Sequence, residues 1–415
     1  MTLKTFIQYG AGNIGRGFIG ALFSEAGYQV KFIDVNKTII DALNSQKSYE
    51  VDVVSLKGNY QIKIKNVCGI DGMNTALVAD AISDADLMAT AVGVNVLPRI
   101  VPNIIEGLRK RWSDGNKKPL NIIICENLID ADAFLRKLIR EKLTDEEKTL
   151  FDSNVGLVEA SIGRMVPVMA YDPNSRDCLH VKVEKYGYLP IDQSAFIGEI
   201  PKIQNLYPFS PFEYFIRRKL YIHNMSHALT AYCGYLEKYN YIWESSENSC
   251  IKLLVQRAMI ESARALSKKY TVPLECILEH IDDLLLRFGN RELGDTVARV
   301  GRDTRRKLSS RDRFAGAIKL CESLSIAPVY ICVGIAAGLL FVCDADEGTK
   351  AVNELLQDKG IDAVLTEICG FDLNSISAKY VKEYYMLLKS GASIENVFAL
   401  CESFEAELLD SRNIV

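Results

Sequence analysis

The chain has few histidines, few tryptophans and no long apolar run. It contains four histidines and two tryptophans in 415 residues. Its eleven cysteines stand singly, with no C-x-x-C pair, so neither a disulfide framework nor a zinc site is predicted. No apolar run is long enough to cross a bilayer, and a predicted strand begins too early to leave room for a signal peptide. We therefore expect a cytoplasmic protein with reduced thiols and no metal.

An excess of one charge is also absent. The 49 basic and 53 acidic residues nearly balance, which gives no reason to expect nucleic acid or a membrane surface as a partner. We find no internal repeat and no low-complexity segment. A chain of this length can bury two hydrophobic cores, so we expect two globular domains and a small-molecule ligand.

A glycine-rich turn follows the first predicted strand. The apolar run 6–9 stops at Gly10, and a helical pattern begins near Asn13. Gly10 allows a sharp turn, Gly12 lets a pyrophosphate approach the backbone, and Gly15 lets the helix pack closely on the strand. The start of the helix also offers unpaired N–H groups to phosphates. The turn predicts a dinucleotide site made of Gly10, Ala11, Gly12, Asn13, Ile14, Gly15, Arg16 and Gly17.

A second predicted strand, 29–33, ends at Asp34, nineteen residues after Gly15. At this spacing a carboxylate binds the adenosine ribose 2′-OH and repels a 2′-phosphate, so NAD is favoured over NADP. The alternatives are a turn without a dinucleotide, or one that holds FAD or another nucleotide. Strand, turn, helix, second strand and Asp34 are all in register, which favours NAD.

The rest of the first half predicts a Rossmann-type domain. Buried apolar strands that alternate with helices indicate a mostly parallel, doubly wound sheet. Thr90, Gly93 and Asn127 follow two of these strands, at the edge where such sheets bind ligands. We predict that Thr90 and Gly93 bind the cofactor. The expected elements are a helix at 37–46, an inserted β-hairpin at 49–56 and 60–67, strands at 86–92 and 120–125, and a helix at 96–112.

The second half is predicted to be helical. Extended pieces and prolines between 155 and 204 indicate a crossover segment. Helices are predicted at 212–220, 224–239, 251–270, 274–288, 305–323 and 328–341, with three more before the end. We predict a nucleotide-binding α/β domain at 1–204 and an all-α substrate domain at 205–415, with the active site between them.

One predicted helix carries a lysine, an amide and two histidines. Lys219, His223 and His227 are four residues apart, so they share a face if the helix is unbroken, and Asn224 lies close by. A metal-free alcohol dehydrogenase needs a base for the hydroxyl proton and donors for the oxygen. Lysine can be that base if burial and the oxidised nicotinamide lower its pKa. The alternative is a solvated basic run beside a packed histidine.

These segments resemble the long-chain polyol dehydrogenases that do not use zinc, and among them the mannitol-1-phosphate 5-dehydrogenases. The resemblance extends from Thr5 to about Arg313. It is carried by residues 10–20, 34–36, 90–93 and 121–127, by K-x4-N-x2-H at Lys219, Asn224 and His227, and by residues 287–290 and 299–308.

The resemblance implies specific roles. Lys219 would be the general acid/base, Asn224 and His227 would bind the reacting oxygen and nearby hydroxyls, and Asn127 would join the catalytic centre. The implied reaction is NAD-linked interconversion of a sugar-alcohol phosphate and a ketose phosphate, of the mannitol 1-phosphate and fructose 6-phosphate type. By the same analogy we expect a monomer.

A phosphorylated substrate needs cations, and residues 299–307 supply five. Guanidinium groups bind phosphate in bidentate fashion, so Arg302 and Arg306 are the predicted substrate ligands. The alternative is a solvated basic helix start.

Four departures from the family pattern leave the substrate open. Gly163 replaces an acidic residue, His223 replaces an aliphatic one, Met225-Ser226 replaces Thr-Gly, and residues 185–188 replace an acidic and aromatic segment. The alternatives are a related oxidoreductase acting on a free polyol, a uronate-type sugar acid or an amino-sugar conjugate, or a non-catalytic protein that binds NAD or a sugar phosphate.

Overall fold

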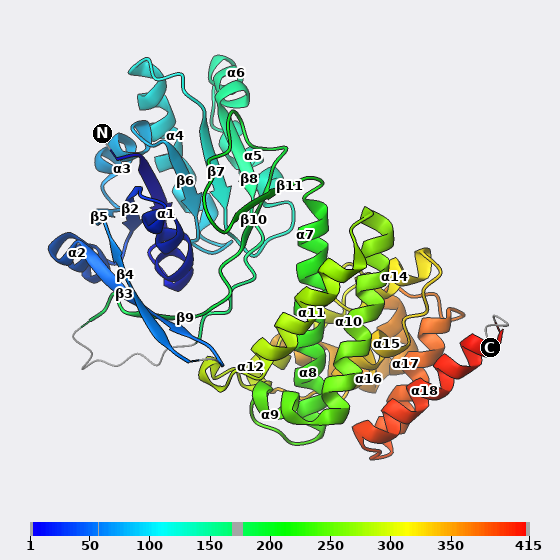
Figure 1. Cartoon of the computed structure of the whole chain (residues 1–415). Helices are drawn as coiled ribbons and strands as arrows, with labels where there is room; N and C mark the ends of the chain where they lie inside the picture. Colours follow the sequence, from blue (N-terminus) through cyan, green and yellow to red (C-terminus); the bar gives the residue numbers. More distant parts are fainter. Residues whose placement is uncertain (1–2, 57, 168–176, 412–415) are drawn as a thin grey trace. The chain divides into compact units, whose positions relative to one another are not determined.

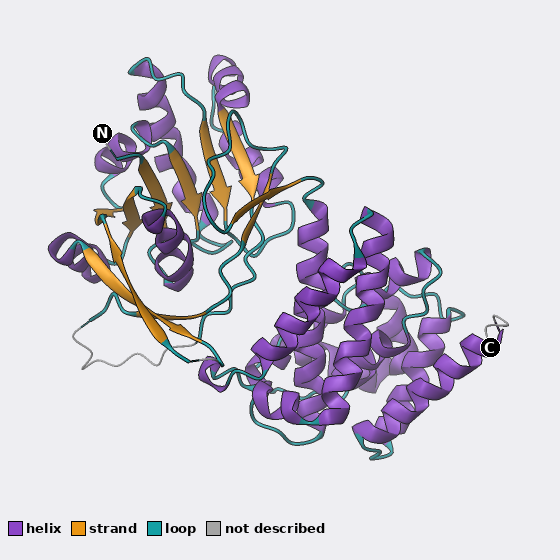
Figure 2. Cartoon of the chain, in the orientation of Figure 1, coloured by secondary structure: helices purple, strands orange, loops and turns teal. Residues whose placement is uncertain are grey.

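The computed structural model describes residues 3–56, 58–167 and 177–411. The chain forms two compact units, 1–216 and 217–415. The first is α/β and the second is built of helices, as the predicted fold class requires (Figures 1 and 2). No helix within the described ranges is long and apolar enough to span a membrane.

The described residues of the first unit form three sheets. Its strands are β1 Thr5–Tyr9, β2 Gln29–Asp34, β3 Ser48–Val54, β4 Tyr60–Lys65, β5 Val67–Asp71, β6 Leu87–Thr90, β7 Leu120–Ile124, β8 Val155–Glu159, β9 Val181–Glu184, β10 Leu189–Asp192 and β11 Leu206–Phe209. Its helices are the π-helical η1 Gly15–Gly20, then α1 Ala21–Glu25, α2 Lys37–Gln46, α3 Thr75–Ser83, α4 Leu97–Ser113, α5 Ala131–Arg140 and α6 Asp145–Asn154.

The main sheet is the predicted doubly wound one. Its order is β5-β2-β1-β6-β7-β8, and every pair in it is parallel. Neighbouring residues of β1 point to opposite faces: Phe6 joins a core with η1, α1 and α2, whereas Ile7 joins a core with α3, α4, α5 and α6. Because the sheet is covered on both faces, its carboxyl edge is the place for a ligand.

The predicted hairpin is confirmed, but its second strand is shorter than expected. β3 and β4 pair in antiparallel fashion from Ser48↔Lys65 to Val53↔Tyr60. The prediction extended this strand to Val67, whereas Asn66 has a φ of 57° and turns the chain away, so that Val67 begins β5 of the main sheet. The alternation of side chains continues through Asn66, and only its left-handed backbone marks the boundary.

Strand β9 also joins this hairpin, in parallel with β3, and packs against η1. A Cβ atom on Gly17 would lie 2.7 Å and 2.8 Å from side-chain atoms of Val183 and Val181. The missing side chain at Gly17 therefore allows close packing of the strand on this helix.

The second unit is a helical bundle whose central helix, α15, is buried along its whole length. The helices are α7 Glu213–Arg218, which leads in from the first unit, the π-helical η2 Lys219–Asn224, α8 Met225–Leu236, α9 Ile242–Glu247, α10 Ser249–Tyr270, α11 Leu274–Phe288, η3 Arg291–Leu293, α12 Val297–Gly301, α13 Thr304–Leu308, α14 Ala315–Ser323, α15 Val329–Gly338, α16 Glu347–Ala363, η4 Val364–Ile368, α17 Ile376–Lys389 and α18 Ile394–Ser411.

Two helix predictions for this unit were wrong. The predicted helix 305–323 is interrupted, because Ser309 is extended at the end of α13 and α14 begins only at Ala315. The predicted helices 212–220 and 224–239 form one continuous helical run, α7–η2–α8. That run contains the predicted catalytic motif.

A buried carboxylate caps α15. Glu261 on α10 accepts hydrogen bonds of 3.0 Å from the backbone N–H groups of Tyr330 and Ile331, in the first turn of α15. These donors have no partner within their own helix. Burial raises the pKa of Glu261 to about 8. The group therefore fixes one helix against another inside the bundle.

Candidate active site

The glycine turn has the shape that a dinucleotide requires. Gly10 has a φ of 95°, and a Cβ atom there would overlap the carbonyl oxygen of Ala91. A Cβ atom on Gly15 would overlap the carbonyl oxygen of Gly10. At Gly12, by contrast, a Cβ atom would meet no other described atom within 4 Å. Gly10 and Gly15 therefore allow close backbone contacts, whereas Gly12 leaves open space beside the backbone.

Asp34 lies against this turn, as its spacing predicted. One carboxylate oxygen accepts a hydrogen bond of 2.6 Å from the N–H of Ala11, and the other accepts one of 2.9 Å from the N–H of Asn36. These bonds fix the carboxylate beside the backbone that would hold the phosphates. The position suits a ligand of the adenosine ribose.

Arg16 contributes to the turn from inside the protein. Its side chain is buried and donates to the carbonyl of Ala11, and burial lowers its pKa. Tyr49 of the hairpin donates a hydrogen bond of 2.7 Å to the Arg16 carbonyl. Asn13 is exposed and Ile14 is partly buried at the start of the helix. The structure thus gives Arg16 and Gly17 packing roles, alongside the cofactor roles that we predicted.

A residue that we did not predict holds the loop after β6. Glu126, two residues after β7, accepts hydrogen bonds of 2.9 Å and 2.8 Å from the N–H groups of Val92 and Gly93. Thr90 is buried at the end of β6, and its hydroxyl has no hydrogen-bond partner among the described residues. Asn127 is exposed beside Glu126. The only sequence signal for Glu126 was its place between a strand and Asn127.

Replacing Glu126 by alanine is expected to raise the dissociation constant for NADH about tenfold. The variant leaves two backbone donors without their acceptor, which costs about 1–3 kcal/mol, and releases the loop that carries Gly93. Titration of NADH fluorescence measures the change. Glu199→Ala, which removes an exposed carboxylate of the same unit, is the control. An unchanged affinity in a folded Glu126→Ala protein would show that the loop does not contribute to cofactor binding.

In the second unit, the lysine motif lies on a π-helical turn. Segment η2 covers Lys219–Asn224, and α8 continues from Met225. Hydrogen bonds in a π-helix join residues five apart, so Lys219 and Asn224 share a face there. Asn224 and His227 are three apart, which places them together on the following α-helical turn. The four-residue spacing of Lys219 and His223, which we had assumed to lie on an α-helix, falls within this π turn, where residues four apart also lie near one face.

The His227 ring is fixed by its neighbours. It stacks on Phe288, with ring centroids 5.1 Å apart and planes 16° apart. Its Nε2 lies 3.2 Å from the Asp295 carboxylate, outside hydrogen-bond geometry. Burial lowers the pKa of His227 to about 3, and nearby cations add to the effect. His223 is also buried, and burial together with Arg287 lowers its pKa. Both imidazoles are therefore neutral at pH 7.

His227 gives a testable pH dependence of stability. Between pH 6.5 and about 3 the unfolded chain binds a proton on this side chain and the folded chain does not, so the free energy of unfolding falls as the pH falls. We expect the free energy of unfolding of His227→Gln to change less steeply with pH than that of the parent, by up to about 1.4 kcal/mol per pH unit. Urea unfolding at pH 4, 5 and 6 measures it. His180, which is partly buried, lies in the other unit. Identical slopes for the His227 variant and the parent would contradict the assigned pKa.

Both halves of the chain match one protein family. Residues 4–205 match the family described as Mannitol dehydrogenase Rossmann domain, and residues 212–405 match Mannitol dehydrogenase C-terminal domain. The chain belongs to the mannitol dehydrogenase family. The predicted enzyme class, an NAD-dependent polyol dehydrogenase, is confirmed by this membership. Family membership does not distinguish an enzyme that acts on a sugar-alcohol 1-phosphate from one that acts on a free polyol.

Two solved structures share the fold of this mannitol dehydrogenase family member. A D-sorbitol dehydrogenase in substrate-free form is 14% identical, with a TM-score of 0.80 over 95% of each chain. The Pseudomonas fluorescens mannitol 2-dehydrogenase, in a ternary complex with NAD and D-mannitol, is 14% identical, with a TM-score of 0.72 over 97% of this chain and 95% of that one.

The predicted phosphate ligands of this family member are already engaged by carboxylates. Arg302, whose side chain is 50% exposed, has its Nε 4.0 Å from Asp346. Arg306 forms ion pairs with Asp303 and with Asp312. The cations that contribute most to the lowered pKa of His227 are others: Arg299, Lys307, Arg313 and Arg287.

Lys307 is buried, as are Arg287 and Arg313, whereas Arg299 is exposed. The Lys307 ammonium group donates to the carbonyls of Val300 and Arg302, and burial lowers its pKa to about 7. We did not predict a role for Lys307 or Arg299, although both lie in the basic segment that we noted. Asp295 was also missed. It lies between His227 and Arg299, and the sequence alone gives no sign of these contacts.

The departure at Gly163 has a structural counterpart in the first unit. Gly163 follows β8, and a Cβ atom there would lie 3.1 Å from the ring of Tyr186. Tyr186 belongs to the other departing segment, 185–188. The aromatic ring therefore fills space next to the position where the family has an acidic side chain.

Within the described residues, no group of three or more histidines, cysteines and carboxylates could hold a metal ion.

Proposed function

We propose that this NAD-dependent polyol dehydrogenase interconverts a sugar-alcohol phosphate and a ketose phosphate, of the mannitol 1-phosphate and fructose 6-phosphate type. The observation that carries the proposal is the positive surrounding of His227. Arg299, Lys307, Arg313 and Arg287 all act on this ring. Arg299, Arg313 and Arg287 are paired with carboxylates, whereas Lys307 donates to the backbone carbonyls of Val300 and Arg302. An anionic substrate stabilises such a cluster, whereas a neutral polyol does not.

In the proposed site the cofactor binds to the first unit. The open backbone at Gly12 takes the pyrophosphate, Asp34 takes the ribose, and Glu126 fixes the loop of Gly93. NAD supplies a hydride acceptor. Asp34 and Gly12 bind and orient the cofactor and take no part in the transfer of the hydride or the proton.

The proton chemistry belongs to the second unit. Lys219 takes the hydroxyl proton of the substrate in the direction of oxidation and returns it in the direction of reduction. Asn224 shares its face of the π turn and donates to the oxygen. Neutral His227 adds a second hydrogen bond without carrying the proton, because its pKa is far below 7. As the resemblance implies, we also propose Asn127 of the first unit as a catalytic residue.

We propose Arg302 and Arg306 as phosphate ligands that exchange a carboxylate partner for the substrate, next to Arg299 and Lys307. Their pairing with Asp346, Asp303 and Asp312 favours the second candidate function, oxidation of a free polyol or a sugar acid. In that case the basic segment stabilises the fold and takes no part in recognition.

A screen of NADH oxidation separates these candidates. Fructose 6-phosphate, fructose and a keto-sugar acid are compared at equal concentration with the purified full-length chain. We expect kcat/KM for the ketose phosphate to exceed that for the free ketose about 100-fold, the effect of one or two charge-assisted contacts. A preference for the free ketose would refute the phosphate proposal, and no oxidation of any substrate would favour a binding protein.

Asp34→Ala is expected to relax the preference for NAD. The variant removes the anion that repels a 2′-phosphate, so the ratio of NAD to NADP efficiency should fall by about tenfold or more. Steady-state kinetics with both cofactors measures it. Asp41→Ala, on α2 of the same unit, is the control. If Asp34→Ala still rejects NADP as strongly as the parent, Asp34 does not bind the ribose.

A further inference from the structure

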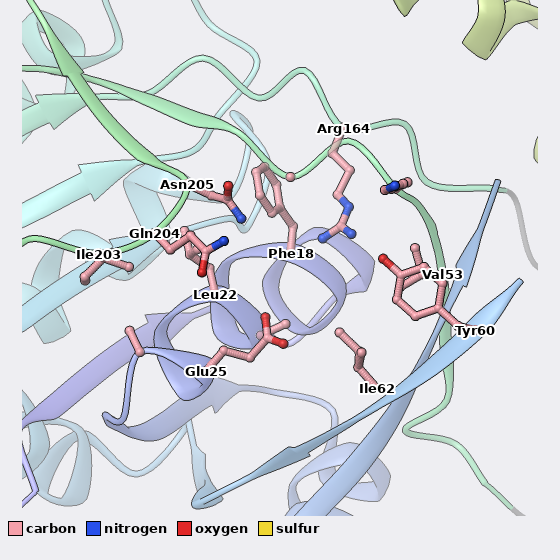
Figure 3. Close-up of a pocket in the computed structure, with 14 residues that line it drawn as sticks. Phe18, Leu22, Glu25, Val53, Tyr60, Ile62, Arg164, Ile203, Gln204 and Asn205 are labelled. Carbon is pink, nitrogen blue, oxygen red and sulfur yellow. The ribbon is translucent and has the colours of Figure 1, made fainter. Parts of the chain in front are cut away.

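A second cavity lies in the first unit, outside the residues of the cofactor turn. It encloses about 560 Å³ and is bounded by the helix η1–α1, the hairpin β3–β4 and the crossover segments (Figure 3). None of Gly10, Gly12, Asp34 or Gly93 lines it. We propose that this cavity is a second ligand site, which takes a small polyhydroxylated molecule of the sugar or sugar-alcohol class.

The floor of the cavity is apolar and fixed. Phe18 and Leu22 lie on one face of the helix and are buried, with exposed fractions of 1% and 7%. Val53 of β3 is buried as well, and Ile62 of β4 is partly buried. These side chains already pack in the core of the unit, so a ligand would meet a preformed surface.

Arg164 forms a rigid part of the wall. Its Nε donates to the Glu184 carbonyl at 2.8 Å, and its Nη1 donates to the Gly17 carbonyl at 3.1 Å. Its guanidinium lies over the Phe18 ring, 5.2 Å from the centroid. A side chain held at three points loses little further freedom when it binds a ligand.

Other polar groups face the same space. Figure 3 shows Glu25, Tyr60, Gln204 and Asn205 arranged around the cavity with Arg164. They come from the helix, the hairpin and the segment before β11. Three separate parts of the unit thus direct hydrogen-bonding groups into one cavity.

The mixture of these groups selects the ligand class. Arg164 and Lys185 can only donate hydrogen bonds and the Glu25 carboxylate can only accept them, whereas the amides of Gln204 and Asn205 do both. Hydroxyl groups on neighbouring carbons also donate and accept, so they can satisfy all of these partners. A hydrocarbon would leave the polar groups unpaired, and a bare inorganic anion would meet the Glu25 carboxylate.

A bulky residue at the rim tests the proposal. Ala26 is exposed at the end of α1 and lines the cavity, so Ala26→Trp fills the space without disturbing the core. Lys202→Trp is the matched control, since Lys202 is exposed near the end of the crossover and does not line the cavity. Binding of radiolabelled mannitol, fructose and fructose 6-phosphate to the full chain is measured by equilibrium dialysis, with NADH present for mannitol and NAD for the two ketoses, so that no ligand is turned over.

For at least one of these ligands, we expect the number of molecules bound per chain to be greater by one in Lys202→Trp than in Ala26→Trp. Comparison of mannitol and fructose with fructose 6-phosphate shows whether the cavity binds a neutral or a phosphorylated ligand. The KM for turnover should be the same in both variants, because neither touches the proposed catalytic residues. Equal binding to the two variants for every ligand would overturn the second site. Loss of turnover in the parent would count against the proposed function and would leave this comparison intact.

Discussion

Lys219→Ala is expected to lower kcat by about 10²- to 10⁴-fold, the usual contribution of a positioned general acid/base. The dissociation constant for NADH should stay within about twofold, because the cofactor residues lie in the other unit. Stopped-flow and steady-state kinetics with the best substrate measure the first quantity, and NADH fluorescence measures the second.

Two controls make the result specific to the amine. Lys252→Ala removes an exposed lysine of α10 and should leave kcat unchanged. Small primary amines added to Lys219→Ala should restore part of the lost turnover, which a purely structural role would not allow. If Lys219→Ala turns over as fast as the parent, the assignment of the base is wrong.

Alanine substitutions at Gly15 and Gly12 are both expected to weaken NADH binding, but only the one at Gly15 should destabilise the fold. A methyl group at Gly15 overlaps the carbonyl of Gly10, so Gly15→Ala should lower the free energy of unfolding by about 1–3 kcal/mol and abolish NADH binding. A methyl group at Gly12 meets no described atom, so Gly12→Ala should keep the parent stability. It should still weaken NADH binding about tenfold or more, because it occupies the space of the pyrophosphate.

Urea unfolding and NADH titration on the same protein samples distinguish the two effects. Gly27, which has a φ of 86° and no close neighbour, is the site for a control substitution, Gly27→Asn, that tests backbone strain alone. Full NADH affinity in Gly12→Ala would show that the pyrophosphate lies elsewhere.

The first unit could be predicted from the sequence because its signals are local. A short stretch of sequence is enough to recognise the apolar runs of β6 and β7, the glycine turn and Asp34. The end of the hairpin could not be predicted in this way. Its alternating pattern continues past Lys65, and the boundary depends on the backbone conformation of Asn66.

The site in the second unit was harder to predict because it depends on contacts between distant segments. Arg302 pairs with Asp346 on another helix, His227 stacks on Phe288, and Asp295 lies near both His227 and Arg299. Composition shows that cations are present in this segment but not which carboxylates take them. For the same reason Glu126 was not recognised, since its partners are 33 and 34 residues away.

The π turn of η2 makes the proposed chemistry sensitive to chain length as well as to residue type. A π turn holds one residue more than an α-helical turn, and deleting a single residue inside it, for instance Tyr221, lets the segment relax to an α-helix. Lys219 and Asn224 would both survive that deletion, four apart instead of five, and still share a face. The upstream residues would keep nearly the same rotation relative to α8, because the π turn holds its extra residue within one turn. The change would be confined to the spacing of Lys219 and Asn224 along the helix. An insertion or deletion in this helix is thus a route by which relatives with the same motif letters can differ in reactivity.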